Sequence, residues 1–90
     1  MNASQTEMVK EILLNSIAEL IRARKKFPDP EHTTIALFEE VGELAQALLH
    51  LREKADNTLI TQAQLRNNAY KEGIQVIAMV LRILTDFTAG

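Results

Sequence analysis

Residues 38–46 read FEEVGELAQ, a short stretch that sets three glutamates and a glycine among leucine, alanine and valine. In a helix, successive residues advance by about 100° around the axis. With Glu40 taken as zero, the apolar residues around it fall between about −40° and +100°. They are Ala36, Leu37, Val41, Leu44, Ala47, Leu48 and Leu51. Glu40 is therefore predicted to lie in the middle of the apolar stripe of a helix, where a carboxylate is costly.

The other two glutamates of this stretch are predicted to point in different directions. Glu43 falls at about −60°, on the edge of the stripe, and Glu39 falls at about −100°, further toward the polar face. We thus expect Glu40 to be buried, Glu43 to lie at the edge of the stripe and Glu39 to lie further toward the polar face.

The next helical segment repeats this arrangement in KEGIQV, residues 71–76. With Glu72 as zero, apolar residues bracket it closely, and Gln75 falls at about −60°. These apolar residues are Leu65, Ala69, Val76, Met79, Val80, Ile83 and Phe87. Each segment therefore carries one glutamate in its stripe and, three residues later, a second oxygen-bearing side chain on the same edge.

Two carboxylates in apolar stripes need compensation, because an unpaired buried carboxylate costs several kcal/mol or becomes protonated. The basic residues of these helices are expected toward the polar edges, with Lys54 at about −40°, Lys71 at about −100° and Arg82 at about −80°. No cation of these two segments is therefore expected inside the stripes.

A hard divalent cation such as Mg²⁺ binds oxygen ligands and would compensate the charge. The spacing predicts a Mg²⁺ site whose ligands are Glu40, Glu43, Glu72 and Gln75. The alternative is that Glu39 and Glu43 form a solvated acidic edge, while the two stripe glutamates are protonated or meet a basic group of another helix or subunit.

Gly42 and Gly73 each lie inside a predicted helix next to a candidate ligand. Glycine in a helix costs about 1 kcal/mol relative to alanine, so each position is expected to have a reason. Close approach of a backbone or ligand, and simple packing between helices, both remain open explanations.

Helical periodicity extends over most of the chain and predicts three helices. The first runs from about Gln5 to Lys26, with Ser4 and Glu7 at capping-box spacing. The second starts at Asp29 and Pro30 and ends near Lys54 or Ala55, and the third runs from Thr61, with Gln64 at capping-box spacing, to about Phe87. The fold class is all-α, as one domain over residues 1–90.

Composition limits what such a chain can be. Ninety residues build only a small core, and 47% of them are hydrophobic, with four aromatic residues and no tryptophan. We therefore expect a helical bundle that associates with itself. The net charge of −2 argues against nucleic acid and anionic membranes as partners, and the lack of cysteine, together with an N-terminus unlike a signal peptide, predicts a cytoplasmic protein.

The two segments EEVGELAQALL and YKEGIQVIAMVLRI resemble the MazG-like members of the all-α nucleoside triphosphate pyrophosphohydrolase superfamily. That family carries E-x-x-E, a spacer and E-x-x-D, and the resemblance covers about residues 28–87. It implies Mg²⁺-dependent cleavage of a nucleoside triphosphate between its α- and β-phosphates, giving the monophosphate and pyrophosphate. It also implies a homodimer or homotetramer.

By this resemblance Glu40, Glu43 and Glu72 become metal ligands, and Glu39 becomes a group that orients a ligand or activates water. Gln75 stands where the family has aspartate. Its carbonyl oxygen can still bind Mg²⁺, but it brings no charge, so the site would be weaker or hold fewer ions. A non-catalytic nucleotide- or metal-binding module, or an interaction module, is the alternative function, and a purely structural bundle is a third.

Four polar side chains are candidates for contacting the substrate, by their direction or their place near the ligands: Lys54, Asn68, Lys71 and Arg82. Lysine and arginine stabilise phosphate charge, and Asn68 lies one turn before Glu72. Each could equally be an ordinary surface residue. Phe27, Phe38, Tyr70 and Phe87 are the aromatic residues available to stack on a base.

Overall fold

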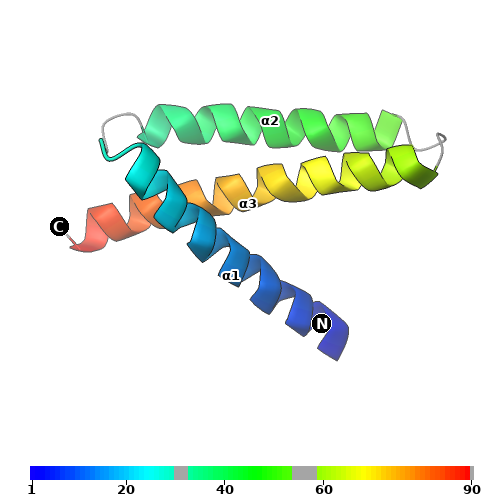
Figure 1. The fold of residues 1–90 in the computed structure, drawn as a ribbon, viewed down its shortest axis with the longest axis horizontal. Coiled ribbons are helices and arrows are strands. Elements are labelled where there is room, and N and C mark those ends of the chain that lie inside the picture. The colour runs from blue at the N-terminus through cyan, green and yellow to red at the C-terminus, as the bar shows by residue number, and fades with distance from the viewer. Residues whose placement is uncertain (30–32, 54–58, 90) are drawn as a thin grey trace.

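A computed structural model describes residues 1–29, 33–53 and 59–89, and over these residues the chain is entirely helical, without strands. The three helices are α1 (Ala3–Lys26), α2 (Thr33–Glu53) and α3 (Leu59–Ala89). In Figure 1, α2 and α3 run side by side in opposite directions, and α1 crosses α3 near its C-terminal end. The all-α prediction is confirmed. No helix in the described part of the chain is long and apolar enough to span a membrane.

The first helix starts two residues earlier than its sequence signal suggested. The Asn2 side chain accepts a hydrogen bond from the backbone N–H of Gln5, and the Gln5 side chain accepts one from the backbone N–H of Asn2. The predicted capping box of Ser4 and Glu7 is therefore wrong. Asparagine caps a helix as well as serine does, so the Asn2 box starts the helix before Ser4 is reached.

Among the described residues, α2 extends from Thr33 to Glu53 and α3 from Leu59 to Ala89. The start predicted at Pro30 and the end predicted at Lys54 or Ala55 lie outside the described residues. Helix α3 begins at Leu59, so Thr61 lies within it and is not the N-cap that its spacing to Gln64 indicated. Leucine and isoleucine at positions 59 and 60 are compatible with a helix, so a polar cap residue further along does not mark the start.

Small side chains make the contact between α1 and α3. Ser16 is completely buried, and its hydroxyl donates to the Ile12 carbonyl oxygen at 2.7 Å. Ala23 on α1, and Ile74 and Ala78 on α3, are the buried apolar residues of the described chain. Small residues let two helix backbones approach closely, which explains how a helix with few buried large side chains is held here.

Polar contacts fix the same two helices on either side of this small core. The Asn15 amide donates to the Tyr70 hydroxyl at 2.9 Å. Near the end of α1, the Arg24 guanidinium lies 2.8 Å from an Asp86 carboxylate oxygen and donates to the Thr85 hydroxyl. The C-terminal half of α1 is thereby anchored to α3, while its N-terminal half projects away from the other helices (Figure 1).

The single chain leaves much apolar surface uncovered. Its radius of gyration is 14.9 Å, against about 12 Å for a compact domain of this length. On α1, the row Val9, Leu13, Ile17 and Ile21 is 40–54% exposed. We refer to these four residues as the α1 row. Phe38 on α2 and Leu84 on α3 are also more than half exposed, so the apolar stripes predicted from sequence are only partly buried within one chain.

Candidate metal centre

Helices α2 and α3 bring three of the predicted ligands together. One carboxylate oxygen from each of Glu40, Glu43 and Glu72 lies within 4.8 Å of the other two. Glu40 and Glu72 are half-buried, and Glu43 is exposed. The antiparallel packing of α2 on α3 produces this convergence, because it sets the two stripe glutamates opposite each other. We call these three residues the carboxylate cluster.

Gln75, the fourth predicted ligand, lies directly against Glu40. Its amide group sits 3.0 and 2.6 Å from the two oxygens of the Glu40 carboxylate. With the NH₂ turned toward Glu40, the amide donates to both oxygens. With the carbonyl turned toward Glu40, oxygen faces oxygen, an arrangement that needs a cation or proton between them. Gln75 can therefore either hold the Glu40 carboxylate by hydrogen bonds or add a fourth oxygen to the cluster.

The pKa values of two carboxyl groups in the cluster, Glu40 and Glu72, are raised. Burial raises the pKa of Glu40 to about 7, and the neighbouring Glu43 charge and contacts with Glu72 add to this shift. Burial also raises the pKa of Glu72, and its hydrogen bond and charge interaction with Glu43 act in the same direction. A positive charge at this point would relieve both effects, because it favours the ionised form of every carboxylate around it.

One buried oxygen atom of the cluster lacks a hydrogen-bond partner in the described part of the chain. Glu72 Oε2 is buried and has no hydrogen-bond partner among the described residues. A buried carboxylate oxygen without a partner is unfavourable and calls for a missing ligand. The donors are oxygen atoms only, which suits a hard cation such as Mg²⁺ or Ca²⁺ better than zinc or copper. The residues present therefore fit Mg²⁺.

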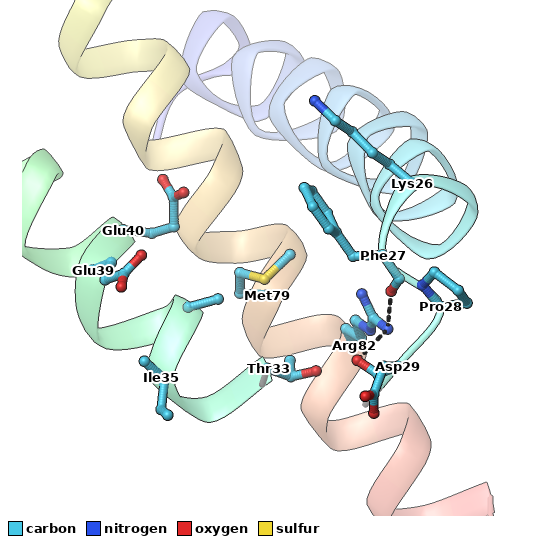
Figure 2. A pocket seen from close by; sticks show the side chains of 11 residues that line it. Lys26, Phe27, Pro28, Asp29, Thr33, Ile35, Glu39, Glu40, Met79 and Arg82 are labelled. Atoms are coloured by element: carbon cyan, nitrogen blue, oxygen red, sulfur yellow. Dashed lines mark hydrogen bonds between the residues drawn. The ribbon is translucent and has the colours of Figure 1, made fainter. Parts of the chain in front are cut away.

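A hollow of about 590 Å³ adjoins the cluster (Figure 2). It is enclosed by the end of α1, the segment that follows it, the start of α2 and one face of α3. Its lining residues are Lys26, Phe27, Pro28, Asp29, Thr33, Ile35, Ala36, Glu39, Glu40, Met79 and Arg82. We call it the large hollow. Glu39, the predicted catalytic residue, is exposed and lies on its wall beside Glu40 rather than within the cluster.

Arg82 lies in a different environment from the one predicted. Its side chain is 3% exposed and donates to the carbonyl oxygens of Phe27, at 2.5 Å, and of Asp29, at 3.5 Å. The expectation that Arg82 lies toward a polar edge is wrong. Periodicity within α3 does not reveal that the segment after α1 covers this face and supplies two carbonyl acceptors to Nη2. The buried Nε has no hydrogen-bond partner among the described residues and lies 3.9 Å from Asp86 Oδ2.

The remaining predicted substrate contacts are spread around the site. Lys71 is exposed and lines a smaller hollow, of about 270 Å³, together with Gln75 and Tyr70. Asn68 is exposed. Lys54 lies outside the described residues. Glu40 thus lines the large hollow, and Gln75, which lies against Glu40, lines the smaller one.

Two residues of the large hollow did not stand out as a pair in the sequence. Phe27 was recognisable only as one of four aromatic residues, and no pattern indicated Thr33. Thr33 is 6% exposed, and its hydroxyl has no hydrogen-bond partner among the described residues. Its place in the hollow depends on how the chain turns between α1 and α2, which local periodicity does not reveal.

The two helical glycines have open space around them. A Cβ atom built on Gly42 or Gly73 would meet nothing within 4 Å, apart from the neighbouring backbone of its own helix. No other described part of this chain therefore approaches either glycine closely.

No family model, curated protein or solved structure matches this chain. The MazG-like resemblance consequently rests on the two glutamate motifs. The fold and site themselves define a small all-helical chain with a carboxylate cluster between two antiparallel helices.

Proposed function

We propose that this chain is a Mg²⁺-dependent nucleoside triphosphate pyrophosphohydrolase of the MazG-like type, which cleaves a (deoxy)nucleoside triphosphate to the monophosphate and pyrophosphate. The observation that carries the proposal is the carboxylate cluster, in which the buried Glu72 Oε2 lacks a partner. An all-oxygen site of this kind beside a hollow of ligand size suits a metal that acts on phosphate groups.

In this proposal Glu40, Glu43 and Glu72 hold the ion. Gln75 adds a fourth oxygen when its carbonyl, and not its NH₂, is turned toward Glu40. The ion supplies charge neutralisation on the phosphate oxygens and favours attack by water. Glu39 is exposed on the wall of the large hollow, where its carboxylate can take the proton of the attacking water. Lys71, exposed beside Gln75, can neutralise charge on the phosphates.

The functional unit is proposed to be a homodimer or homotetramer. The chain exposes 6813 Å², about 1,500 Å² more than a compact monomer of its mass. Two copies burying that excess would form an interface of roughly 3,000 Å², within the 2,000–5,000 Å² typical of permanent assemblies. The exposed α1 row is a continuous apolar strip suited to such contact.

Pyrophosphate release tests the proposed activity. The assay would present common and modified (d)NTPs with Mg²⁺ to the wild type, Glu40→Ala and Glu53→Ala. Glu53 is exposed at the end of α2 and provides a control that removes the same charge from the same helix. We expect turnover to fall at least 100-fold in Glu40→Ala alone. Equal turnover in all three proteins would exclude the cluster as the catalytic site.

The amide at position 75 favours a second function, that of a non-catalytic nucleotide- or metal-binding module. Gln75 can donate hydrogen bonds to both oxygens of Glu40, but it adds no negative charge to the cluster. Binding can tolerate this lower charge more readily than catalysis can. Gln75→Asp distinguishes the two functions. Activity that is absent from the wild type and present in Gln75→Asp would establish the non-catalytic function.

A further inference from the structure

The large hollow differs in chemistry from the cluster beside it. Phe27, Ile35 and Met79 contribute large apolar surfaces. Phe27 is 59% exposed, and the Lys26 ammonium lies over its ring, 5.4 Å from the ring centroid. Figure 2 shows this ring on one side of the hollow and Glu39 and Glu40 on the other, with Met79 between them on α3. An exposed aromatic face opposite carboxylates offers a stacking surface for a flat ligand whose other end is anionic and held through a cation.

A buried hydroxyl in the same hollow has no partner. Thr33 lies at the start of α2 and is 6% exposed, and its Oγ1 makes no hydrogen bond among the described residues. A threonine hydroxyl can donate one hydrogen bond and accept two. Leaving it unsatisfied in a buried position is unfavourable. A ligand with a donor or acceptor on its edge would satisfy it.

The backbone that carries the Phe27 ring is anchored to α3. Arg82 is itself buried and donates to the carbonyl oxygens of Phe27 and Asp29, which ties the segment after α1 to α3. Arg82 is therefore a positioning residue for this wall. Sites whose walls are already fixed lose less entropy on binding, which strengthens their affinity for a ligand.

Charge decides which part of a nucleotide the hollow suits. The described charged residues that line it are three carboxylates, Asp29, Glu39 and Glu40, and two cations, Lys26 and Arg82. The Arg82 Nη2 donates to the backbone carbonyls of Phe27 and Asp29. Carboxylates outnumber cations among these residues, so phosphates are repelled at the wall formed by Glu39 and Glu40, whereas an uncharged ring is not. A volume of about 590 Å³ lies within the usual range for small-molecule sites.

On these grounds, and resting on the proposed function, we propose that the large hollow seats the base and sugar of the nucleotide. Phe27 stacks on the base, the Thr33 hydroxyl reads one of its polar groups, and the phosphates extend past Glu40 to the cluster. Base preference is then set by the start of α2 and the end of α1, and not by the metal ligands.

Binding measurements with two kinds of ligand test this assignment. Non-hydrolysable α,β-methylene analogues of the four common dNTPs carry the nucleoside, and inorganic tripolyphosphate carries only the phosphates. Affinities would be measured by calorimetry with Mg²⁺ for the wild type, Phe27→Ala, Thr33→Val and Thr33→Ser. Phe87→Ala is the control, since Phe87 is 87% exposed and does not line the hollow.

We expect Phe27→Ala to weaken nucleotide binding by about five- to a hundredfold, the range for loss of one stacked ring. Tripolyphosphate binding should not change. Thr33→Val should reduce the difference in affinity between the four bases, and Thr33→Ser, which keeps the hydroxyl, should retain that difference. Circular dichroism of each variant at the assay temperature identifies any that fails to fold. If the variants at position 27 or at position 33 do not fold, the binding data for the other position test the proposal.

Two results would overturn the base seat, and only one of them would also overturn the proposed function. Nucleotide affinities unchanged in Phe27→Ala and Thr33→Val, with the wild type binding nucleotide, would reject the base seat and leave the proposed function standing. A wild type that binds neither nucleotide nor tripolyphosphate with Mg²⁺ would reject the proposed function and the seat together.

Discussion

At the scale of single residues, Glu40 is the group on which the site depends. It belongs to the carboxylate cluster, lies against Gln75 and also lines the large hollow. Burial and the charge of Glu43 raise its pKa to about 7. Around neutral pH a proton would therefore compete with the proposed metal ion for the same oxygens, since metal binding requires the ionised form.

The raised pKa of Glu40 predicts a pH-dependent stability of the metal-free protein. A carboxyl whose native pKa lies above its unfolded value stabilises the fold fully below about pH 4.5, and this contribution is lost as pH rises through about 7. We expect the free energy of unfolding to fall by roughly 1–2 kcal/mol between pH 5 and pH 8, after allowance for screening by water.

Urea denaturation in the presence of EDTA at several pH values measures this fall. Glu40→Gln should remove most of it and should be more stable than the wild type at pH 8, whereas Glu53→Gln should behave like the wild type. Mg²⁺ should stabilise the wild type more at pH 8 than at pH 5, because protons compete with the ion at low pH. A wild-type stability independent of pH over this range would contradict the assigned environment of Glu40.

Gln75 allows a second residue-scale prediction. Replacing its amide by a carboxylate adds charge to the cluster and removes the donor that faces Glu40. We expect Gln75→Asp to bind Mg²⁺ about tenfold or more tightly at pH 8, and to be less stable than the wild type without metal. Isothermal titration calorimetry gives the affinity and the number of ions bound. Gln64→Asp, on an exposed part of α3, is the matched control and should leave both unchanged.

At the scale of the helices, α3 organises the molecule, because it packs against both α1 and α2. Helices α1 and α3 are in contact, and the buried residues include the small side chains of Ser16 and Ala23 on α1 and of Ala78 on α3, which suit close approach of two helices. The pairing with α2 brings the carboxylate cluster together. One helix thus carries the contact with α1 and also supplies Glu72 to the carboxylate cluster.

The helical glycines provide a test at this scale. Nothing in the described chain lies near an added Cβ at Gly42 or Gly73, so alanine should raise helix stability by about 0.5–1 kcal/mol at each position. Thermal unfolding of Gly42→Ala and Gly73→Ala would measure the gain. A loss of stability in either variant would show that a second copy of the chain or a ligand lies against that helix face.

At the scale of the whole molecule, the open arrangement of α1 is the main feature. Its N-terminal half extends away from α2 and α3, and the chain spans 47 × 31 × 20 Å (Figure 1). The apolar α1 row remains exposed, with Val9 and Leu13 on this half and Ile17 and Ile21 on the C-terminal half. A surface of this kind is unfavourable in water unless another surface covers it.

Self-association through the α1 row can be tested with one charge. Ile17→Lys places a cation in the middle of the row, and we expect it to convert the oligomer into a monomer and to lower its melting temperature. Light scattering coupled to size-exclusion chromatography measures the mass. Glu11→Lys, also exposed on α1, is the control and should keep the wild-type mass. A wild type that is monomeric at micromolar concentration would contradict the proposed assembly.

The sequence by itself determined the features that depend on local spacing. Helical periodicity predicted the three helices, and the positions of Glu40 and Glu72 within their stripes predicted that carboxylates gather between α2 and α3. The precise helix starts were less predictable, because Ser4 and Thr61 carry the same capping signal as true N-caps. These are all consequences of residues that are neighbours along one helix.

Only the tertiary structure decided which residues of other elements contact these helices. Arg82 is buried because the segment after α1 passes over α3 and offers the carbonyl oxygens of Phe27 and Asp29. The large hollow exists for the same reason, since Phe27 and Thr33 belong to different elements that meet only when α1 crosses α3. Such contacts depend on the direction in which a connection turns, and that direction is set by packing between helices rather than by the periodicity within any one of them.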